Sequence, residues 1–322
     1  MADDTLDYSI EIDKKIPEAF SKAGLQKVEN FKRLTHGEQN YVYKVKTTSS
    51  YYVLRVFREK WWPEEDKPLW IEKEFIKYSI PHAKIIYQSR LSNVFPFGFM
   101  IMEFLDGENG ESVIKNGKLS FEEFHKNLFL SLSKIHQIKI KKYGLIKAGE
   151  GEFETYAEFK LNDFRDKKEE LLKLKDFNSS LLDGLEVKIK ETLSKFEDLF
   201  SPTLVHGDAT PDNSIYTEDG EVILIDWDDG RSGIWFDDYA WITYCGSHIT
   251  NKGTLEARRK ILLNLMDKYE GNALKSNDLL QLEKLLHLLK TINLLPYYYF
   301  VRKNQQYYDK TLFKFNSLLK NL

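Results

Sequence analysis

Apolar residues recur with two different periods along the chain, and the change of period divides it into a β-rich first third and a helical remainder. In the first 104 residues, short runs of β-branched and aromatic residues are separated by turn residues, which is typical of an antiparallel sheet. Helical spacing interrupts these runs at residues 16–23, where Gly24 ends the helix, and at residues 69–78. The predicted strands lie at residues 31–34, 41–46, 51–57, 83–87 and 98–104.

Beyond residue 104 the apolar residues follow helical spacing. Phe124, Leu128 and Leu132 form part of an apolar stripe in a helix predicted over residues 121–138. Further helices are predicted over residues 153–174, 181–200, 235–247, 255–270, 279–302 and 307–319. Pro296 should kink the helix in which it lies. We therefore expect an α+β protein with a five-stranded antiparallel sheet in an N-terminal lobe, residues 1–104, and a mostly helical C-terminal lobe, residues 105–322.

Composition narrows the class of protein. Of the 322 residues, 42% are hydrophobic and 14% are aromatic, which is enough for a large core. The formal net charge of −3 gives no sign of a nucleic-acid partner. Cys245 is the single cysteine, so an intrachain disulfide is excluded. The acidic start is unlike a signal peptide, and no apolar run reaches the ~18 residues that a membrane span needs. We expect a cytoplasmic protein with no membrane contact.

The segment LVHGDATPDNSIYTEDGEVILIDWDDG, residues 204–230, places three polar side chains where short strands end. Asp208 and Asn213 lie in the loop between the first two strands, and Asp226 ends the third. Polar groups in loops on a rigid support are often functional. The three strands are predicted over residues 203–205, 214–216 and 222–225, with a turn at residues 218–220.

The chemistry of these side chains favours a hard cation. Two carboxylates and an amide offer oxygen ligands, which suit Mg²⁺ better than zinc. Protein kinases have the same order, with a catalytic-loop Asp, an Asn five residues later and a further metal-binding Asp. Each of these residues, taken alone, is common in turns. Here, however, Asn213 follows Asp208 by five residues, and Asp226 ends the second strand after the loop. This combination favours a phosphoryl-transfer site.

HGDATPDN followed by ILIDWDDG resembles the motif of the aminoglycoside phosphotransferase and choline kinase-like family. The resemblance implies a protein-kinase-like fold of two lobes and an enzyme that transfers the γ-phosphate of ATP or GTP to a hydroxyl of a small molecule. It implies Mg²⁺ as cofactor, Asp208 as catalytic base, His206 as a residue that orients the catalytic loop, and Asn213 and Asp226 as metal ligands.

The first lobe carries candidate nucleotide-binding residues. THGEQNYVYKV would by itself be a hairpin turn, but it resembles the family's phosphate-binding loop, which implies that Gly37 and Asn40 contact the nucleotide. Arg55 alternates with Leu54 and Val56, so it lies on the other face of its strand. The resemblance implies that Arg55 binds phosphate.

Two further nucleotide contacts follow from the same resemblance. A helical glutamate, either Glu72 or Glu74, should pair with Arg55, and Glu72 fits the family spacing better. The segment from Glu103 to Leu105 resembles the connector between lobes, whose backbone binds the adenine edge.

Other residues have structural interpretations. His136 ends a helix and is expected to be packed, and Asp238 is expected to support the catalytic loop. Tyrosines at residues 297–299, 307 and 308 could line an acceptor pocket, but core packing is the simpler interpretation. Residues 231–322 contain more basic than acidic residues, which argues against a polycationic acceptor.

Two other functions remain open. YVLRVFREKWWPEE resembles the branch of stress-response protein Ser/Thr kinases in the same clan, so a protein acceptor is the first alternative. A nucleotide-binding pseudokinase scaffold is the second, although Asp208, Asn213 and Asp226 are all intact. The sequence does not choose between ATP and GTP, and it carries no signal for the oligomeric state.

Overall fold

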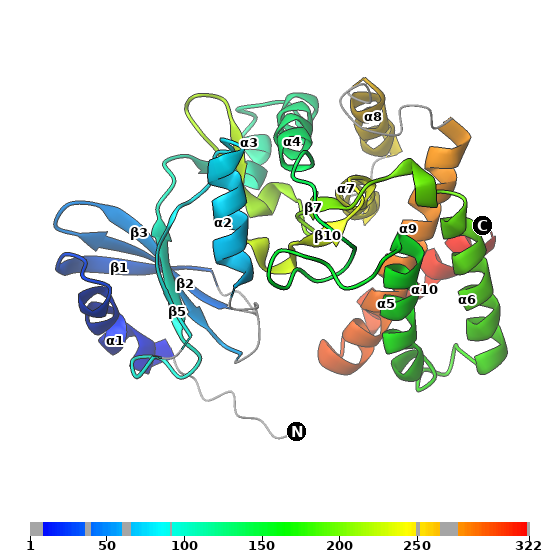
Figure 1. The fold of residues 1–322 in the computed structure, drawn as a ribbon, viewed down its shortest axis with the longest axis horizontal. Helices are drawn as coiled ribbons and strands as arrows, with labels where there is room; N and C mark the ends of the chain where they lie inside the picture. Colours follow the sequence, from blue (N-terminus) through cyan, green and yellow to red (C-terminus); the bar gives the residue numbers. More distant parts are fainter. Residues whose placement is uncertain are drawn as a thin grey trace. The chain divides into compact units, whose positions relative to one another are not determined.

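The computed structural model describes residues 9–35, 40–59, 66–90, 92–248, 252–264 and 276–320. The chain forms two compact units (Figure 1). The first unit is Met1–Glu108 together with Ile215–Asp228, and the second is Asn109–Ser214 together with Asp229–Leu322. The hairpin that ends at Asp226 therefore belongs to the first unit, although it follows much of the second unit in sequence.

The first unit contains the predicted sheet. Its five strands pair antiparallel in the order β1-β2-β3-β5-β4, which confirms the prediction. On β3, Arg55 lies opposite Val42 of β2 and Met100 of β5. The strands are β1 (Val28–Thr35), β2 (Asn40–Thr47), β3 (Tyr51–Phe57), β4 (Ile85–Ser89) and β5 (Phe99–Glu103).

The two helices of the first unit lie on opposite faces of this sheet (Figure 1). The first, α1 (Ser9–Lys22), begins well before the predicted start and contains Pro17. Its buried residues Ile12 and Ile16 recur at helical spacing and pack with the sheet residue Leu54. Packing against the sheet thus extends the helix toward the N-terminus, beyond the predicted start at residue 16.

The second face of the sheet is covered by α2 (Lys67–Lys77) and by the segment that contains the β8–β9 hairpin and the residues directly after it. Phe75 of α2 meets Trp227 edge-on, with ring centroids 4.9 Å apart. The buried Lys67 Nζ donates a hydrogen bond to the carbonyl oxygen of Asp228 at 2.6 Å. The segment itself comprises β8 (Ser214–Tyr216), β9 (Val222–Leu224) and the start of a 3-10 helix (Trp227–Asp229); β8 pairs with β9 and with the two-residue β6 (Glu108–Asn109).

The second unit is mostly helical, as predicted. Its centre is α9, which contacts α5, α6, α7 and α10 (Figure 1). The short strands β7 (Thr203–Val205) and β10 (Arg231–Gly233) form an antiparallel pair. The helices are α3 (Gly110–Lys115), α4 (Phe121–Ile135), α5 (Tyr156–Leu171), α6 (Ser179–Ser194), α7 (Phe236–His248), α8 (Lys252–Leu263), α9 (Ser276–Pro296) and α10 (Gln305–Lys320).

Capping residues explain two of the differences from the predicted helix bounds, the starts of α5 and α6. α5 begins three residues later than predicted because Thr155 accepts a hydrogen bond from the backbone of Glu158. α6 begins two residues earlier because the Asn178 side chain caps it. α9 ends at Pro296, and a π-helical turn (Tyr297–Val301) follows instead of a simple kink. Within the part of the chain that the structure describes, no helix combines the length and the apolar character that crossing a bilayer requires.

Gly110 offers a test of how tightly α3 packs against the loop before β8. A Cβ at this position would lie 2.4 Å from both Phe124 Cζ and Ser214 Oγ, and 2.7 Å from the Pro211 carbonyl oxygen. Gly110→Ala should therefore lower the free energy of unfolding by about 2 kcal/mol, measured by urea denaturation, because the new methyl group overpacks the contact.

Gly184 is the matched control. It lies inside α6, and nothing comes within 4 Å of an added Cβ. Gly184→Ala should raise the free energy of unfolding by about 1 kcal/mol, since alanine loses less backbone entropy in a helix. Equal effects of the two substitutions would contradict the packing described for α3.

Candidate active site

The loop after β7 is held by one buried carboxylate. Asp238, near the start of α7, accepts hydrogen bonds from the backbone N–H groups of His206 at 2.9 Å and Gly207 at 2.8 Å. It also accepts one from His136 Nε2 at 3.0 Å. Burial alone would raise the pKa of Asp238, but these hydrogen bonds and the nearby His136 lower it below its ordinary value. The expected supporting role of Asp238 is confirmed.

Gly207 allows this loop to pass close to the chain. It has a φ of 79°, in the left-handed region that favours glycine. A Cβ at this position would lie 2.5 Å from the Asp229 carbonyl oxygen. The Asp208 backbone N–H donates to His206 Nδ1 at 3.3 Å, so His206 contacts the loop that it was expected to orient.

The Asp208 carboxylate is fixed by two donors. Asn213 Nδ2 donates to Asp208 Oδ2 at 2.7 Å and to its backbone oxygen at 3.0 Å, and Trp241 Nε1 donates to Asp208 Oδ1 at 2.6 Å. Burial raises the pKa of Asp208, and the nearby His206 and Lys290 oppose that rise. The structure thus brings Asp208 and Asn213 together.

A second charged cluster lies in the first unit. Arg55 Nη2 donates to Asp228 Oδ2 at 2.6 Å and to Asp226 Oδ1 at 3.1 Å, and Asn40 Nδ2 donates to Asp228 Oδ2 at 2.8 Å. Burial alone would lower the pKa of Arg55, but attraction to Asp228 and Asp226 raises it above its ordinary value. Three of the predicted residues, Asn40, Arg55 and Asp226, therefore share one network through Asp228.

Asp226 and Asp228 have different surroundings. The Asp226 side chain is 47% exposed, whereas that of Asp228 is 4% exposed. Asp226 also has a φ of 64°, a left-handed conformation that is uncommon and costly for residues other than glycine. This unfavourable backbone conformation lies between the end of β9 and the start of the 3-10 helix, and there the Asp226 carboxylate is exposed to solvent.

The predicted roles of Glu72 and Gly37 have different outcomes in the structure: one is contradicted, and the other concerns a residue that the structure does not describe. The predicted pairing of Glu72 with Arg55 is wrong: Glu72 Oε1 accepts the backbone N–H of Ile85 at 2.6 Å, and Glu74 pairs with Lys77 at 2.8 Å. The carboxylates of Asp226 and Asp228 hold Arg55 instead. Gly37 lies outside the described residues.

The connector after β5 is described. The Glu103 backbone N–H donates to the Lys84 carbonyl oxygen at 2.8 Å. This N–H group is therefore engaged within the sheet, and Leu105 follows it in a partly exposed position beyond the strand.

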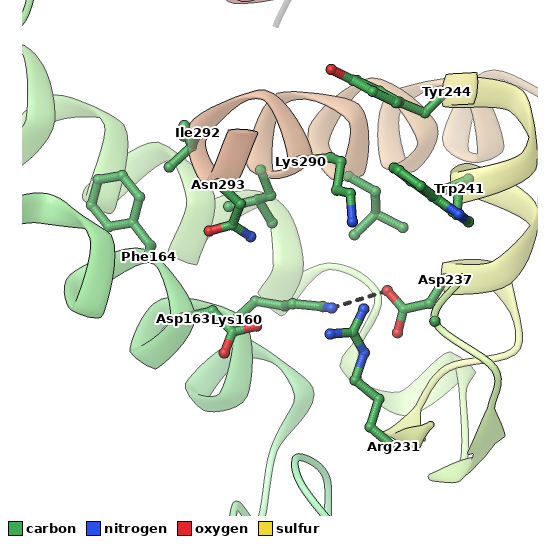
Figure 2. Close-up of a pocket in the computed structure, with 14 residues that line it drawn as sticks. Lys160, Asp163, Phe164, Arg231, Asp237, Trp241, Tyr244, Lys290, Ile292 and Asn293 are labelled. Carbon is green, nitrogen blue, oxygen red and sulfur yellow. Dashed lines mark ion pairs between the residues drawn. The ribbon is translucent and has the colours of Figure 1, made fainter. Parts of the chain in front are cut away.

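A cavity of about 80 Å³ adjoins Asp208 inside the second unit. Gly207 and Trp241, which neighbour Asp208 in sequence and by hydrogen bond, form part of its wall. Three basic side chains, Lys160, Arg231 and Lys290, also line it (Figure 2). Asp163 and Asp237 are the acidic residues of the lining, so basic side chains outnumber acidic ones in a cavity whose wall includes neighbours of the candidate base.

The oxygen atoms that could hold Mg²⁺ are those of Asn213 and Asp226. Both hydrogen bonds of the Asn213 amide are made by Nδ2, so its Oδ1 points away from Asp208. Carboxylate and amide oxygens are what Mg²⁺ accepts, and it commonly takes one or two protein ligands together with phosphate oxygens. Among the described residues, no three His, Cys, Asp or Glu side chains gather closely enough to hold a metal by themselves.

Reasoning from sequence missed several residues at the site. Trp241 lies three positions after Asp238 on α7, so helical spacing places both on the face toward the loop. That spacing was the one available signal for Trp241. Lys290 and Arg231 come from α9 and β10, far from the motif in sequence, and no local pattern indicates them.

Comparison with known proteins gives a family and a fold. The model of the phosphotransferase enzyme family matches residues 30–271. No curated protein matches the chain. The aminoglycoside phosphotransferase APH(4)-Ia has a similar structure, with a TM-score of 0.69 and 13% identity over 97% of this chain and 98% of its own. A thermostable mutant of it has been crystallised with AMP-PNP and hygromycin B.

Two other solved structures share the fold. A Haemophilus somnus protein assigned as a fructosamine-3-kinase has a TM-score of 0.63 and 18% identity over 98% of this chain and 100% of its own. The choline kinase LicA from Streptococcus pneumoniae has a TM-score of 0.60 and 16% identity over 96% of this chain and 98% of its own. These likenesses confirm the expected kinase-like fold. The family match covers most of the chain, which belongs to the phosphotransferase enzyme family.

Proposed function

We propose that the protein transfers the γ-phosphate of ATP or GTP to a hydroxyl group of a small molecule in a Mg²⁺-dependent reaction. The observation that carries this proposal is the fixed Asp208 carboxylate, which receives hydrogen bonds from Asn213 and Trp241 and adjoins a cavity. Its family supports phosphoryl transfer to an alcohol, and the complex of APH(4)-Ia with AMP-PNP supports a nucleoside triphosphate as donor.

Asp208 acts as the base in this proposal. Its carboxylate accepts the proton of the acceptor hydroxyl while the hydroxyl oxygen attacks the γ-phosphorus. A new O–P bond forms, the bond from the γ-phosphorus to the bridging oxygen breaks, and the nucleoside diphosphate leaves. Trp241 and Asn213 hold the two carboxylate oxygens, so the base is oriented before the acceptor arrives.

Asn213 and Asp226 would hold the magnesium ions that accompany the nucleotide. When bound, Mg²⁺ neutralises the charge that develops on the phosphoryl oxygens. The exposed carboxylate of Asp226 and the free side of the Asn213 amide suit this role. Arg55 and Asn40 contact the phosphates in the proposal, Gly37 approaches them through its backbone, and the segment from Glu103 to Leu105 binds the base.

Replacing the base tests the proposal directly. Asp208→Asn should lower kcat by about 10³-fold, because proton transfer by a positioned base contributes roughly that much. The dissociation constant of the nucleotide should change little. Steady-state kinetics with ATP and Mg²⁺, together with nucleotide titration, would measure both quantities.

Trp241→Phe is the matched variant. It keeps an aromatic ring but removes the donor to Asp208 Oδ1, so kcat should fall by only about tenfold, the value of one hydrogen bond to a charged group. Wild-type turnover in Asp208→Asn would refute the assignment of the base.

Asp226→Ala tests the metal ligand. The substitution should weaken binding of the magnesium–nucleotide complex at least about tenfold, because a charged oxygen ligand is lost. In EDTA, the variant and the wild type should bind nucleotide with similar affinity. Asp219→Ala serves as control, since Asp219 is an exposed acidic residue in the turn between β8 and β9. Unchanged affinity of Asp226→Ala at saturating Mg²⁺ would count against a metal-binding role.

A further inference from the structure

The cavity beside Asp208 contains more basic than acidic side chains. Lys160, Arg231 and Lys290 line it, against the two carboxylates of Asp163 and Asp237. Figure 2 shows Lys290 and Arg231 reaching toward each other from opposite walls, with the Lys160–Asp237 ion pair running between them. A basic side chain of the lining is available to a ligand only where no carboxylate of the protein already neutralises it.

Asp237 is fully engaged by other groups. Its Oδ1 accepts hydrogen bonds from Tyr156 Oη at 2.6 Å and from Lys160 Nζ at 3.0 Å, and its Oδ2 accepts the backbone N–H of Ile234 at 3.2 Å. Asp237 thus neutralises Lys160. It makes no hydrogen bond to Arg231 among the residues that the structure describes.

Arg231 has unused donors. Its Nε is buried and has no hydrogen-bond partner in the described part of the chain. Asp237, Asp163 and Asp229 act on it only through longer-range attraction, which raises the pKa of Arg231 and keeps the guanidinium charged. A buried charged donor without a partner costs free energy unless a ligand provides one.

Lys290 is the second cation without a carboxylate partner. Its Nζ lies 3.7 Å from the centroid of the Trp241 ring, a cation–π contact. No described carboxylate pairs with it within ion-pair distance. Burial and the positive charge of Arg231 lower the pKa of Lys290, although Asp229 and Asp208 oppose this effect. Two like charges therefore face one cavity.

We propose that Arg231 and Lys290 bind an anionic group of the acceptor, a carboxylate or a phosphate, and so make the acceptor a small hydroxylated acid or phosphate ester. This proposal rests on the proposed function, because it takes the cavity beside Asp208 as the acceptor site. The cavity of about 80 Å³ has room for roughly six water-sized groups. A chain of three or four carbons with one anionic end fits this space.

The site also orients the acceptor. The Asp208 carboxylate repels the anionic end and attracts a hydroxyl proton, whereas Arg231 attracts the anionic end. Asp163 is the remaining acidic group of the lining, and Figure 2 shows it beside the stem of Lys160, on the side opposite Asp237. The hydroxyl group thus faces Asp208.

Four acceptors with one carbon skeleton test the proposal. They are glycerol, glycerate, glycerol 3-phosphate and 1-amino-2,3-propanediol, each assayed with ATP and Mg²⁺. We expect kcat/KM to be at least about tenfold higher for glycerate or glycerol 3-phosphate than for glycerol, and lowest for the amine, because each hydrogen bond to a charged group contributes at least that factor. The two anionic compounds distinguish a carboxylate from a phosphate.

Variants of α9 supply the control. Lys290→Gln should lower kcat/KM for the anionic acceptor at least about tenfold more than it lowers kcat/KM for glycerol, while Lys290→Glu should favour the amine. Lys284→Gln, on the same helix but outside the cavity, should keep the wild-type preference. A preference for glycerol or the amine in the wild type would overturn the anionic acceptor and leave the proposed phosphotransferase intact.

A binding measurement separates the two proposals when turnover is absent. Inorganic phosphate and acetate are titrated by calorimetry into protein saturated with AMP-PNP and Mg²⁺, which occupies the nucleotide site. One of these anions should bind to the wild type and to Lys284→Gln, and at least about tenfold more weakly to Lys290→Gln. Equal binding in all three proteins would overturn the anion site. Loss of turnover with every acceptor, together with anion binding that depends on Lys290, would instead refute the proposed reaction.

Discussion

The buried carboxylate of Asp238 is the interaction on which the loop after β7 depends. It accepts two backbone N–H groups of the loop and the ring of His136. A buried carboxylate is tolerated because these hydrogen bonds replace those it would make to water, and removing one partner of such a group costs several times more than an exposed ion pair contributes. Because Asp238 lies on α7, the position of that helix fixes both the loop and Trp241, and hence the direction of the Asp208 carboxylate.

In the first unit, Asp228 has a comparable role for Arg55. It is almost fully buried and lies 2.6 Å from Arg55 Nη2, whereas the exposed Asp226 lies 3.1 Å away. Asp228 therefore holds the guanidinium in place, whereas the Asp226 carboxylate is accessible to a second cation from solvent. In the proposed reaction this arrangement would keep Arg55 oriented before a phosphate binds, which is the condition for effective electrostatic stabilisation. Asn40 completes the arrangement by donating to the same oxygen of Asp228.

The local sequence was sufficient to predict the short strands and loops that carry the candidate residues. Asp208, Asn213 and Asp226 stand at the ends of short strands, and local turn chemistry fixes those positions. The Arg55 partner could not be predicted, because the choice between a helical glutamate and Asp228 depends on how α2 and the hairpin pack on the sheet. The basic residues of the cavity wall could not be predicted from the sequence either. Arg231 lies on a strand of three residues, which is too short to show an apolar period, and Lys290 lies on α9, about eighty residues after the loop.

The placement of those two basic residues bears on how a family of phosphotransferases can serve different acceptors. The base and its supports come from the loop and α7, whereas Lys290 comes from α9 and Arg231 from the strand that pairs with β7. A substitution at position 290 changes the charge of the cavity without altering any hydrogen bond to Asp208 among the described residues, because Trp241 and Asn213 supply those bonds. Under the two proposals, the charge of the acceptor could thus be selected separately from the hydrogen bonds that orient the base. The Lys290–Trp241 contact limits that independence, since Trp241 belongs to both sets.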